Sequence, residues 1–266
     1  MIFCPYAGQA LPFFIDKKGS KKSSQNKHLS TALAWTRPGI LAGQPAFYKH
    51  MMQKFKTVLF DLDGTLADTL PLCILAFRKA IEPLINRSLS DQEIIATFGP
   101  SEEGTIMALA PKHYEQGMES YLSYYRQLHP MCPEPFDGIK AIMNDLQSQG
   151  LFMGLVTGKG QGSTNISLDQ FGLRGYFSFV ETGWQHGPRK ATAIRNILNQ
   201  HQTVPKQSVI YVGDSPSDIE ASKEVGIPVV AAAWADTADV DTLKSLKPDQ
   251  LFYHINDFSH WLYQRI

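Results

Sequence analysis

Short apolar runs alternate with amphipathic stretches along most of this 266-residue chain. Each run is rich in residues that favour β-strands, and polar residues or glycine follow it. Such alternation predicts an α/β fold, with a Rossmann-like parallel sheet that carries helices on both faces. The predicted strands are Thr57 to Phe60, Phe152 to Val156, Phe177 to Val180, Val209 to Val212 and Pro228 to Ala231.

The stretches between these strands have the spacing of helices with one apolar face. In the first of them Ile139, Ile142 and Leu146 recur at intervals that place them on one side of a helix. The predicted helices are Ile139 to Gln149, Ser163 to Phe171, Lys190 to Gln200 and Ser217 to Val225.

One interval breaks this rhythm. Between Leu70 and Pro133 the sequence has no convincing strand, only amphipathic helical segments such as "YEQGMESYLSYYRQL". We interpret residues 70–133 as a helical cap domain, inserted just beyond the first strand of a core formed by residues 54–69 and 134–266.

The first part of the chain differs from the rest in charge. From Met1 to Phe60 the only acid is Asp16, against nine lysines and arginines. The stretch "DKKGSKKSSQNKHLSTALAWTRPG" has no helical or strand periodicity. We expect residues 1–53 to be a disordered or non-native extension, with Met51 or Met52 as candidate true starts and an organelle presequence as the alternative.

Overall composition narrows the class of protein. The 25 basic and 25 acidic residues balance, so the chain has no general attraction for nucleic acid or an anionic membrane. No apolar run approaches the ~20 residues of a membrane helix, and the three cysteines lack metal-binding spacing. These features predict a cytoplasmic monomer or small homo-oligomer.

Residues suited to binding a metal ion or phosphate follow three of the predicted strands. The strand ends read "DLDGT" from Asp61, "TGKG" from Thr157 and "GDSPSD" from Gly213, and Lys190 opens a predicted helix. Ligands of open parallel sheets bind beyond the carboxyl ends of the strands. Carboxylates there suit a hard divalent cation, whereas lysine and threonine bind phosphate oxygens. A bound cation would also offset the repulsion between clustered acids.

These segments resemble the four motifs of the haloacid dehalogenase superfamily, in its phosphatase branch: "DLDGT", Thr157 in "LVTGK", Lys190, and "GDSPSD". A helical insert between the first and second motifs resembles the subgroup that includes phosphoglycolate phosphatases and β-phosphoglucomutases. The resemblance covers about Thr57 to the C-terminus.

The resemblance implies a catalytic and metal-binding set. Asp61 would be the nucleophile that forms an aspartyl-phosphate, and Asp63 would be the general acid and then the general base. Mg²⁺ would be held by the Asp61 carboxylate, the Asp63 backbone carbonyl and Asp214, with Asp218 close behind. Because Ser215-Pro216-Ser217-Asp218 is also typical of a helix start, Asp218 has capping or a water-mediated role as the alternatives to direct metal contact.

The resemblance also implies that Thr157, Gly158 and Lys190 bind the phosphate group and that Thr65 steadies the first loop. Arg189 offers a competing cation, since Ala191 replaces the proline that often follows the third-motif lysine. Lys159 follows Gly158, but the spacing to Gly154 and the glycine after Lys159 do not fit a nucleotide-binding P-loop.

The expected function is therefore Mg²⁺-dependent hydrolysis of a small phosphorylated metabolite, with 2-phosphoglycolate suggested by the resemblance. A phosphomutase, which also uses D-x-D-G, is the alternative enzyme. A non-catalytic regulatory protein that binds a phosphorylated metabolite is the alternative of a different class. Asp63 disfavours a dehalogenase, which has no alkoxide to protonate.

Overall fold

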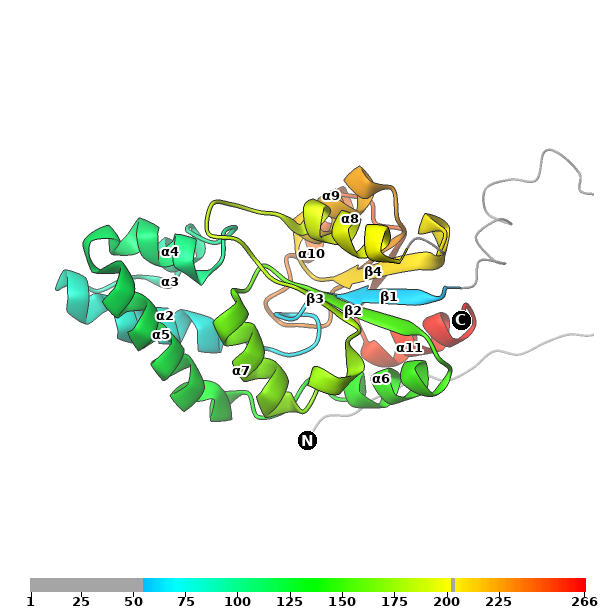
Figure 1. Cartoon of the computed structure of the whole chain (residues 1–266), viewed down its shortest axis with the longest axis horizontal. Helices are drawn as coiled ribbons and strands as arrows, with labels where there is room; N and C mark the ends of the chain where they lie inside the picture. Colours follow the sequence, from blue (N-terminus) through cyan, green and yellow to red (C-terminus); the bar gives the residue numbers. More distant parts are fainter. Residues whose placement is uncertain (1–54, 202–203) are drawn as a thin grey trace, which may run out of the picture. The chain divides into compact units, whose positions relative to one another are not determined.

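The computed structural model describes residues 55–201 and 204–266, so the predictions for residues 1–53 lie outside the described residues. Six parallel strands form one sheet in the order β3-β2-β1-β4-β5-β6. This order is that of a Rossmann-like sheet, which confirms the predicted fold class. Figure 1 labels β1 to β4 of this sheet. The strands are β1 Thr57–Phe60, β2 Phe152–Val156, β3 Phe179–Glu181, β4 Val209–Gly213, β5 Val229–Ala232 and β6 Gln250–Phe252.

Helices cover both faces of this sheet. One face packs against α6 (Ile139–Ser148), α7 (Gln161–Phe171) and α11 (Ile255–Tyr263). The other face packs against α8 (Lys190–Gln200), α9 (Pro216–Val225) and α10 (Val240–Ser245). Short 3-10 helices lie at Pro111–His113, His129–Met131, Arg174–Tyr176 and Lys206–Ser208.

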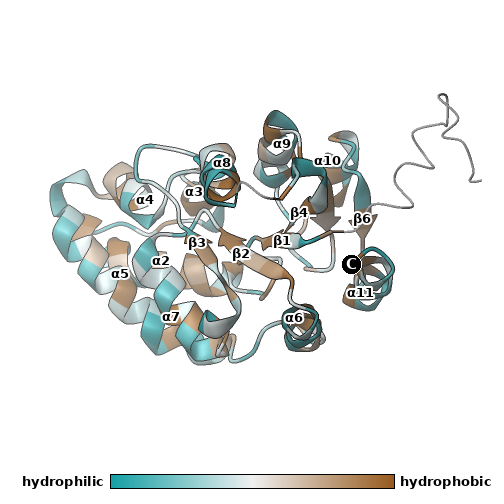
Figure 2. Cartoon of the chain, turned by 45° about the vertical axis from the view of Figure 1, so that its right-hand side comes forward, coloured by the Kyte–Doolittle hydropathy of each residue, from teal (hydrophilic) through white to brown (hydrophobic). Residues whose placement is uncertain are grey.

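Alternation along the strands explains the two-sided packing. In β1, Val58 and Phe60 belong to the core against α6 and α11, whereas Leu59 belongs to the core against α8 and α9. All three are at most 1% exposed, so this strand has to be apolar on both faces. Figure 2 shows the hydrophobic colour gathered on the central strands and on helix faces turned toward them.

The segment after β1 is helical. It forms α2 (Leu70–Ile85), α3 (Asp91–Ile95), α4 (Glu102–Leu109) and α5 (Tyr114–Leu128). These helices bury their own apolar cluster, in which the rings of Phe77 and Tyr121 stack with centroids 4.2 Å apart. We call α2 to α5 the cap helices, and their role as a separate cap domain with limits at 70 and 133 stays a prediction.

Several elements differ by one or two residues from their predicted bounds, and α7 begins at Gln161 rather than Ser163. The third strand begins at Phe179 rather than Phe177, because Phe177 ends a short 3-10 helix and packs partly buried against the core. The sequence did not reveal β6, whose three residues pair with the edge of β5. Among the described residues no helix is long and apolar enough to cross a membrane.

Candidate active site

The candidate site lies where the strand order reverses, at the carboxyl ends of β1 and β4. These two strands are direct neighbours, with Phe60 opposite Val212, and the Asp61 N–H donates to the Val212 carbonyl at 2.9 Å. Asp61 therefore emerges beside Asp214, which follows β4. This crevice is the usual ligand position in an open α/β sheet.

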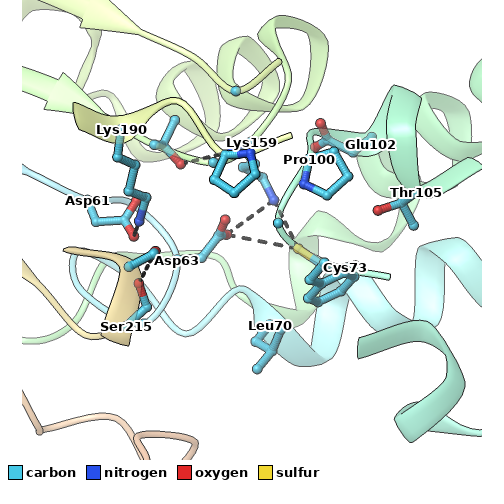
Figure 3. A pocket seen from close by; sticks show the side chains of 18 of the residues that line it. Asp61, Asp63, Leu70, Cys73, Pro100, Glu102, Thr105, Lys159, Lys190 and Ser215 are labelled. Atoms are coloured by element: carbon cyan, nitrogen blue, oxygen red, sulfur yellow. Dashed lines mark hydrogen bonds and ion pairs between the residues drawn. The ribbon is translucent and has the colours of Figure 1, made fainter. Parts of the chain in front are cut away.

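A cavity of about 320 Å³ opens at this point between the strand ends and helices α2, α4 and α5. Most of the predicted site residues line it, and Figure 3 shows several of them from close by. Thr65 and Asp218 lie behind the lining and contact Asp214 and Lys190 respectively. The lining residues from the prediction are Asp61, Asp63, Thr157, Gly158, Lys190 and Asp214.

Lys190 links two of the acids. Its Nζ donates to Asp61 Oδ2 at 2.7 Å and to Asp218 Oδ1 at 2.5 Å. Burial opposes the charge on Lys190, but Asp218 and Asp61 outweigh it and raise the pKa of this lysine. Burial raises the pKa of Asp61 to about 7, although Lys190 lowers it. The charged Lys190 side chain is thus held beside Asp61, at the carboxyl end of β1.

Arg189, the competing cation, has a different partner. Its Nη2 donates to Glu181 Oε2 at 2.8 Å, at the end of β3. Lys190, the first residue of α8, is therefore the third-motif residue that faces Asp61.

Asp214 is held by the loop that carries the first motif. Thr65 Oγ1 donates to Asp214 Oδ1 at 3.0 Å, and Trp234 Nε1 donates to the Thr65 carbonyl at 3.0 Å. Gly64 has a φ of +72°, and a Cβ there would lie 2.1 Å from Asp214 Oδ2. Only glycine combines this backbone conformation with so close a contact.

Three carboxylates form a donor set for a cation. Oxygens of Asp61, Asp214 and Asp218 all lie within 4.8 Å of one another. Burial, together with Asp61 and Asp218, raises the pKa of Asp214 well above its ordinary value. A hard divalent cation would relieve this crowding of acids, so the donor set fits such an ion.

Asp218 also caps helix α9. Its Oδ2 accepts from the Ser215 backbone N–H at 2.9 Å and from Ser215 Oγ at 2.6 Å, which completes a capping box. Because Oδ1 accepts from Lys190, both oxygens of Asp218 already have partners. In the structure Asp218 thus caps α9 and binds Lys190.

Lys159 is a site residue to which the sequence analysis gave no role. Its Nζ lies 3.1 Å from Asp63 Oδ1 and 2.9 Å from Cys73 Sγ, and 4.5 Å from the centroid of the Tyr125 ring. Figure 3 shows Asp63, Lys159 and Cys73 converging on one another. Asp63 Oδ1 also accepts from Thr69 Oγ1. The side chain of Asp63 is thus held between the second-motif loop and the start of α2.

Electrostatics fix the charge states around Lys159. Burial disfavours its charge, but the neighbouring Asp63 outweighs the burial, so the pKa of Lys159 is raised well above its ordinary value. Burial raises the pKa of the Cys73 thiol to about 12, so the thiol is neutral at pH 7. Its position two residues after Thr157 places Lys159 near a strand end, but nothing in the sequence indicated Asp63 as its partner.

Glu102 joins the cap helices to the second-motif loop. Its Oε2 accepts from the Gly160 backbone N–H and its Oε1 accepts from Ser163 Oγ, at the beginning of α7. Glu102 is only 5% exposed, and burial raises its pKa despite the nearby Lys159. The carboxylate supplies hydrogen-bond acceptors that the first turn of α7 lacks within the helix. Nothing in the sequence near Glu102 indicated this partner.

Comparison with known proteins places the chain in a family. The model of the haloacid dehalogenase-like hydrolase family matches residues 58–232, and the chain belongs to this family. The match confirms the resemblance drawn from the motifs and the expectation of an enzyme.

Similar proteins support this assignment. The pyrophosphatase PpaX of Anoxybacillus flavithermus is 26% identical over 203 residues, which cover 76% of this chain and 94% of that protein. A haloacid dehalogenase-like hydrolase from Streptococcus pneumoniae superimposes with a TM-score of 0.64, at 22% identity, over 78% of this chain and 98% of that one. A "predicted phosphoglycolate phosphatase" from Haemophilus somnus has a TM-score of 0.64 at 23% identity, over 79% and 99%. These two structures show the same fold.

Proposed function

We propose that this protein is a cytoplasmic, Mg²⁺-dependent phosphatase that hydrolyses a small phosphomonoester through an aspartyl-phosphate on Asp61. The observation that carries the proposal is the position of Asp61. It emerges from β1 with Lys190 Nζ 2.7 Å away and with oxygens of Asp214 and Asp218 nearby, at the edge of a cavity that would admit a small ester.

The metal ion would be held by the Asp61 carboxylate, Asp214 and the backbone carbonyl of Asp63. Oxygen donors of this kind suit Mg²⁺. Asp218 would support the site from behind, because it accepts from Lys190 and caps the start of α9. When bound, the ion neutralises phosphate charge, so that an anionic carboxylate is able to attack an anionic ester.

The chain's own residues carry the proton and the phosphoryl group. A carboxylate oxygen of Asp61 attacks phosphorus while the bond from phosphorus to the ester oxygen breaks. Asp63 gives its proton to the departing alkoxide, so that a neutral alcohol leaves. Asp63 then accepts a proton from the water that attacks the same phosphorus. This second step releases inorganic phosphate and restores the Asp61 carboxylate and the Asp63 acid.

Thr157, Gly158 and Lys190 would orient the phosphate group during both steps, and Thr65 would support them from the first-motif loop. Thr157 is 2% exposed and lies at the end of β2, next to Gly158, where the backbone leaves room for a ligand. The Lys190 ammonium supports the attacking carboxylate and pairs with a phosphate oxygen. Thr65 steadies Asp214 from the first-motif loop.

The first test is release of phosphate from p-nitrophenyl phosphate by the purified protein, with Mg²⁺ and with EDTA. We expect turnover with Mg²⁺, loss of turnover with EDTA, and none for Asp61→Asn. Turnover that EDTA does not affect, or that Asp61→Asn retains, would contradict the proposal. The names of the relatives supply pyrophosphate and 2-phosphoglycolate as further substrates to compare.

A further inference from the structure

The cavity has two chemically different sides. The strand-end side carries the acids and the proposed phosphate site, whereas the side toward the cap helices, here named the cap side, is mostly apolar. Phe98 lies 5.9 Å from Phe77, ring centroid to ring centroid, and Phe77 stacks on Tyr121. The cap side consists of Leu70, Cys73, Phe77, Phe98, Pro100 and Tyr121, with the polar residues Glu102 and Thr105.

The polar groups of the cap side already have partners. Thr105 Oγ1 donates to the Thr97 carbonyl at 3.3 Å. Glu102 accepts from Gly160 and Ser163, and the Tyr121 hydroxyl points at the same carboxylate at 3.5 Å. None of the residues that form the cap side is a cation, and the acid among them is Glu102. The Lys159 ammonium reaches the cap side at Cys73 Sγ, 2.9 Å away.

The cations that line the cavity are each paired with an acid. Lys190 contacts Asp61 and belongs to the phosphate site. Lys159 contacts Asp63 at 3.1 Å, and its side chain is only 3% exposed. An anionic leaving group would have to compete with Asp63 for this lysine.

Of the described cations that line the cavity, Arg189 is the strongest alternative partner for an anionic leaving group. It pairs with Glu181 at 2.8 Å, but its side chain is 33% exposed and its buried Nε has no hydrogen-bond partner. It comes from the strand-end side, next to Lys190. An anionic group bound to Arg189 would lie beside the phosphate site rather than on the cap side. The experiment therefore has to distinguish binding at Arg189 from binding on the cap side.

We propose that the substrate is a phosphomonoester whose leaving group is a neutral, largely apolar alcohol seated on the cap side. This inference rests on the proposed phosphatase function. A second phosphate or a carboxylate placed among these rings and beside Glu102 would lose its hydration without gaining a free cation. An apolar group placed there gains by leaving water. The substrate class thus differs from pyrophosphate and 2-phosphoglycolate.

Isobutyl phosphate and 2-phosphoglycolate form a matched pair, since two methyl groups replace the two carboxylate oxygens on nearly the same shape. The experiment measures kcat/KM for both, for pyrophosphate, and for methyl, propyl and pentyl phosphate, with p-nitrophenyl phosphate as the positive control. We expect isobutyl phosphate to exceed 2-phosphoglycolate and pyrophosphate at least tenfold. Along the alkyl series kcat/KM should rise about fourfold per added methylene until the cap side is full.

The outcomes separate this inference from the function on which it rests. Hydrolysis of p-nitrophenyl phosphate together with equal or higher kcat/KM for 2-phosphoglycolate or pyrophosphate would overturn the substrate class alone. No Mg²⁺-dependent hydrolysis of any ester would overturn the proposed function as well. If 2-phosphoglycolate is preferred and Arg189→Gln removes that preference, Arg189 is the anion site and the inference is wrong.

A charge placed on the cap side gives a second test. Phe98 is 36% exposed, so Phe98→Arg has room to keep its guanidinium hydrated in the free protein. This variant should raise kcat/KM for 2-phosphoglycolate relative to isobutyl phosphate by roughly tenfold, whereas the control Phe98→Leu should leave the ratio unchanged. Equal ratios in Phe98→Arg and Phe98→Leu would show that the leaving group does not lie on the cap side.

Discussion

At the scale of single residues, the site is a set of acids held in place by two lysines, the buried Lys159 and the partly buried Lys190. Lys190 contacts Asp61 and Asp218, and Lys159 contacts Asp63. The burial of these charges is tolerable because each lysine has a carboxylate at hydrogen-bond distance. Removing one partner would leave the other charge buried and alone, so substitutions here affect both folding and catalysis.

Asp63→Asn tests the assignment of the general acid and base. We expect kcat to fall by roughly 10²–10⁴-fold for an alkyl phosphate. For p-nitrophenyl phosphate the release of the first product should fall least, because p-nitrophenolate leaves without a proton. Rapid-quench measurement of both products checks this. An equal loss of the first step for both esters would contradict the role of Asp63.

Lys159→Met tests whether this lysine positions Asp63. The variant keeps the length of the side chain but removes the contact with Asp63, so we expect kcat for an alkyl phosphate to fall by roughly 10–100-fold. The loss for the first step with p-nitrophenyl phosphate should be smaller. Cys73→Ala removes the other partner of Lys159 and serves as the control for packing. If both variants lose the same activity on both esters, Lys159 has only a structural role.

At the scale of elements, the contact of Glu102 with the start of α7 connects the cap helices to the second-motif loop. Gly160 donates its N–H to Glu102, and Thr157 and Lys159 lie in the three residues before Gly160. The cap helices therefore influence the phosphate site through the backbone of this loop as well as through the cavity lining.

Glu102→Ala should release the loop from α4. Loss of this buried acceptor leaves the Gly160 N–H without its partner, and we expect a loss of about 1–3 kcal/mol in unfolding free energy and a higher KM. The exposed Glu115→Ala, on α5, is the matched control and should change neither quantity. Denaturant unfolding and steady-state kinetics measure both. Unchanged stability and KM in Glu102→Ala would contradict a coupling between the cap helices and this loop.

The sequence predicts those elements and residues whose signal is local. β1, β2 and β4 stand out as apolar runs, and Asp61, Lys190 and Asp214 mark strand ends or a helix start. β6 escapes such reasoning because its three residues form a strand only by pairing with β5. The roles of Lys159 and Glu102 could not be predicted from local sequence for a similar reason. Their partners Cys73 and Gly160 lie 86 and 58 residues away in the sequence, and only folding brings these groups together.

At the scale of the whole molecule, Phe55, which precedes the first strand, contacts the C-terminal segment. This residue is 4% exposed, its N–H donates to the Arg265 carbonyl at 2.6 Å, and its ring lies 6.0 Å from that of Trp261. The first strand of the core begins two residues later, at Thr57. The segment that leads into β1 and the C-terminal segment with α11 thus stabilise each other.

A chain that begins at Met51 should keep its fold and activity. The preceding sequence has the composition of a segment that buries too little apolar surface to offset its ordering entropy. Thermal melting and p-nitrophenyl phosphate turnover of the two forms decide this. The control is a chain that begins after Phe55, which should be destabilised. A loss of several degrees in Tm for the chain from Met51 would show that residues 1–50 are part of the folded structure.

In the proposed mechanism Asp61 carries the phosphoryl group, and the Asp63→Asn variant makes this intermediate directly observable. With p-nitrophenyl phosphate and Mg²⁺, this variant should release a burst of p-nitrophenol close to one equivalent, because the first step needs no acid while the second lacks its base. Mass spectrometry of the acid-quenched protein should then place a phosphoryl group on the peptide that contains Asp61. The double variant Asp61→Asn, Asp63→Asn should show neither signal. A burst without a phosphoryl group on Asp61, or with one on another residue, would contradict the mechanism.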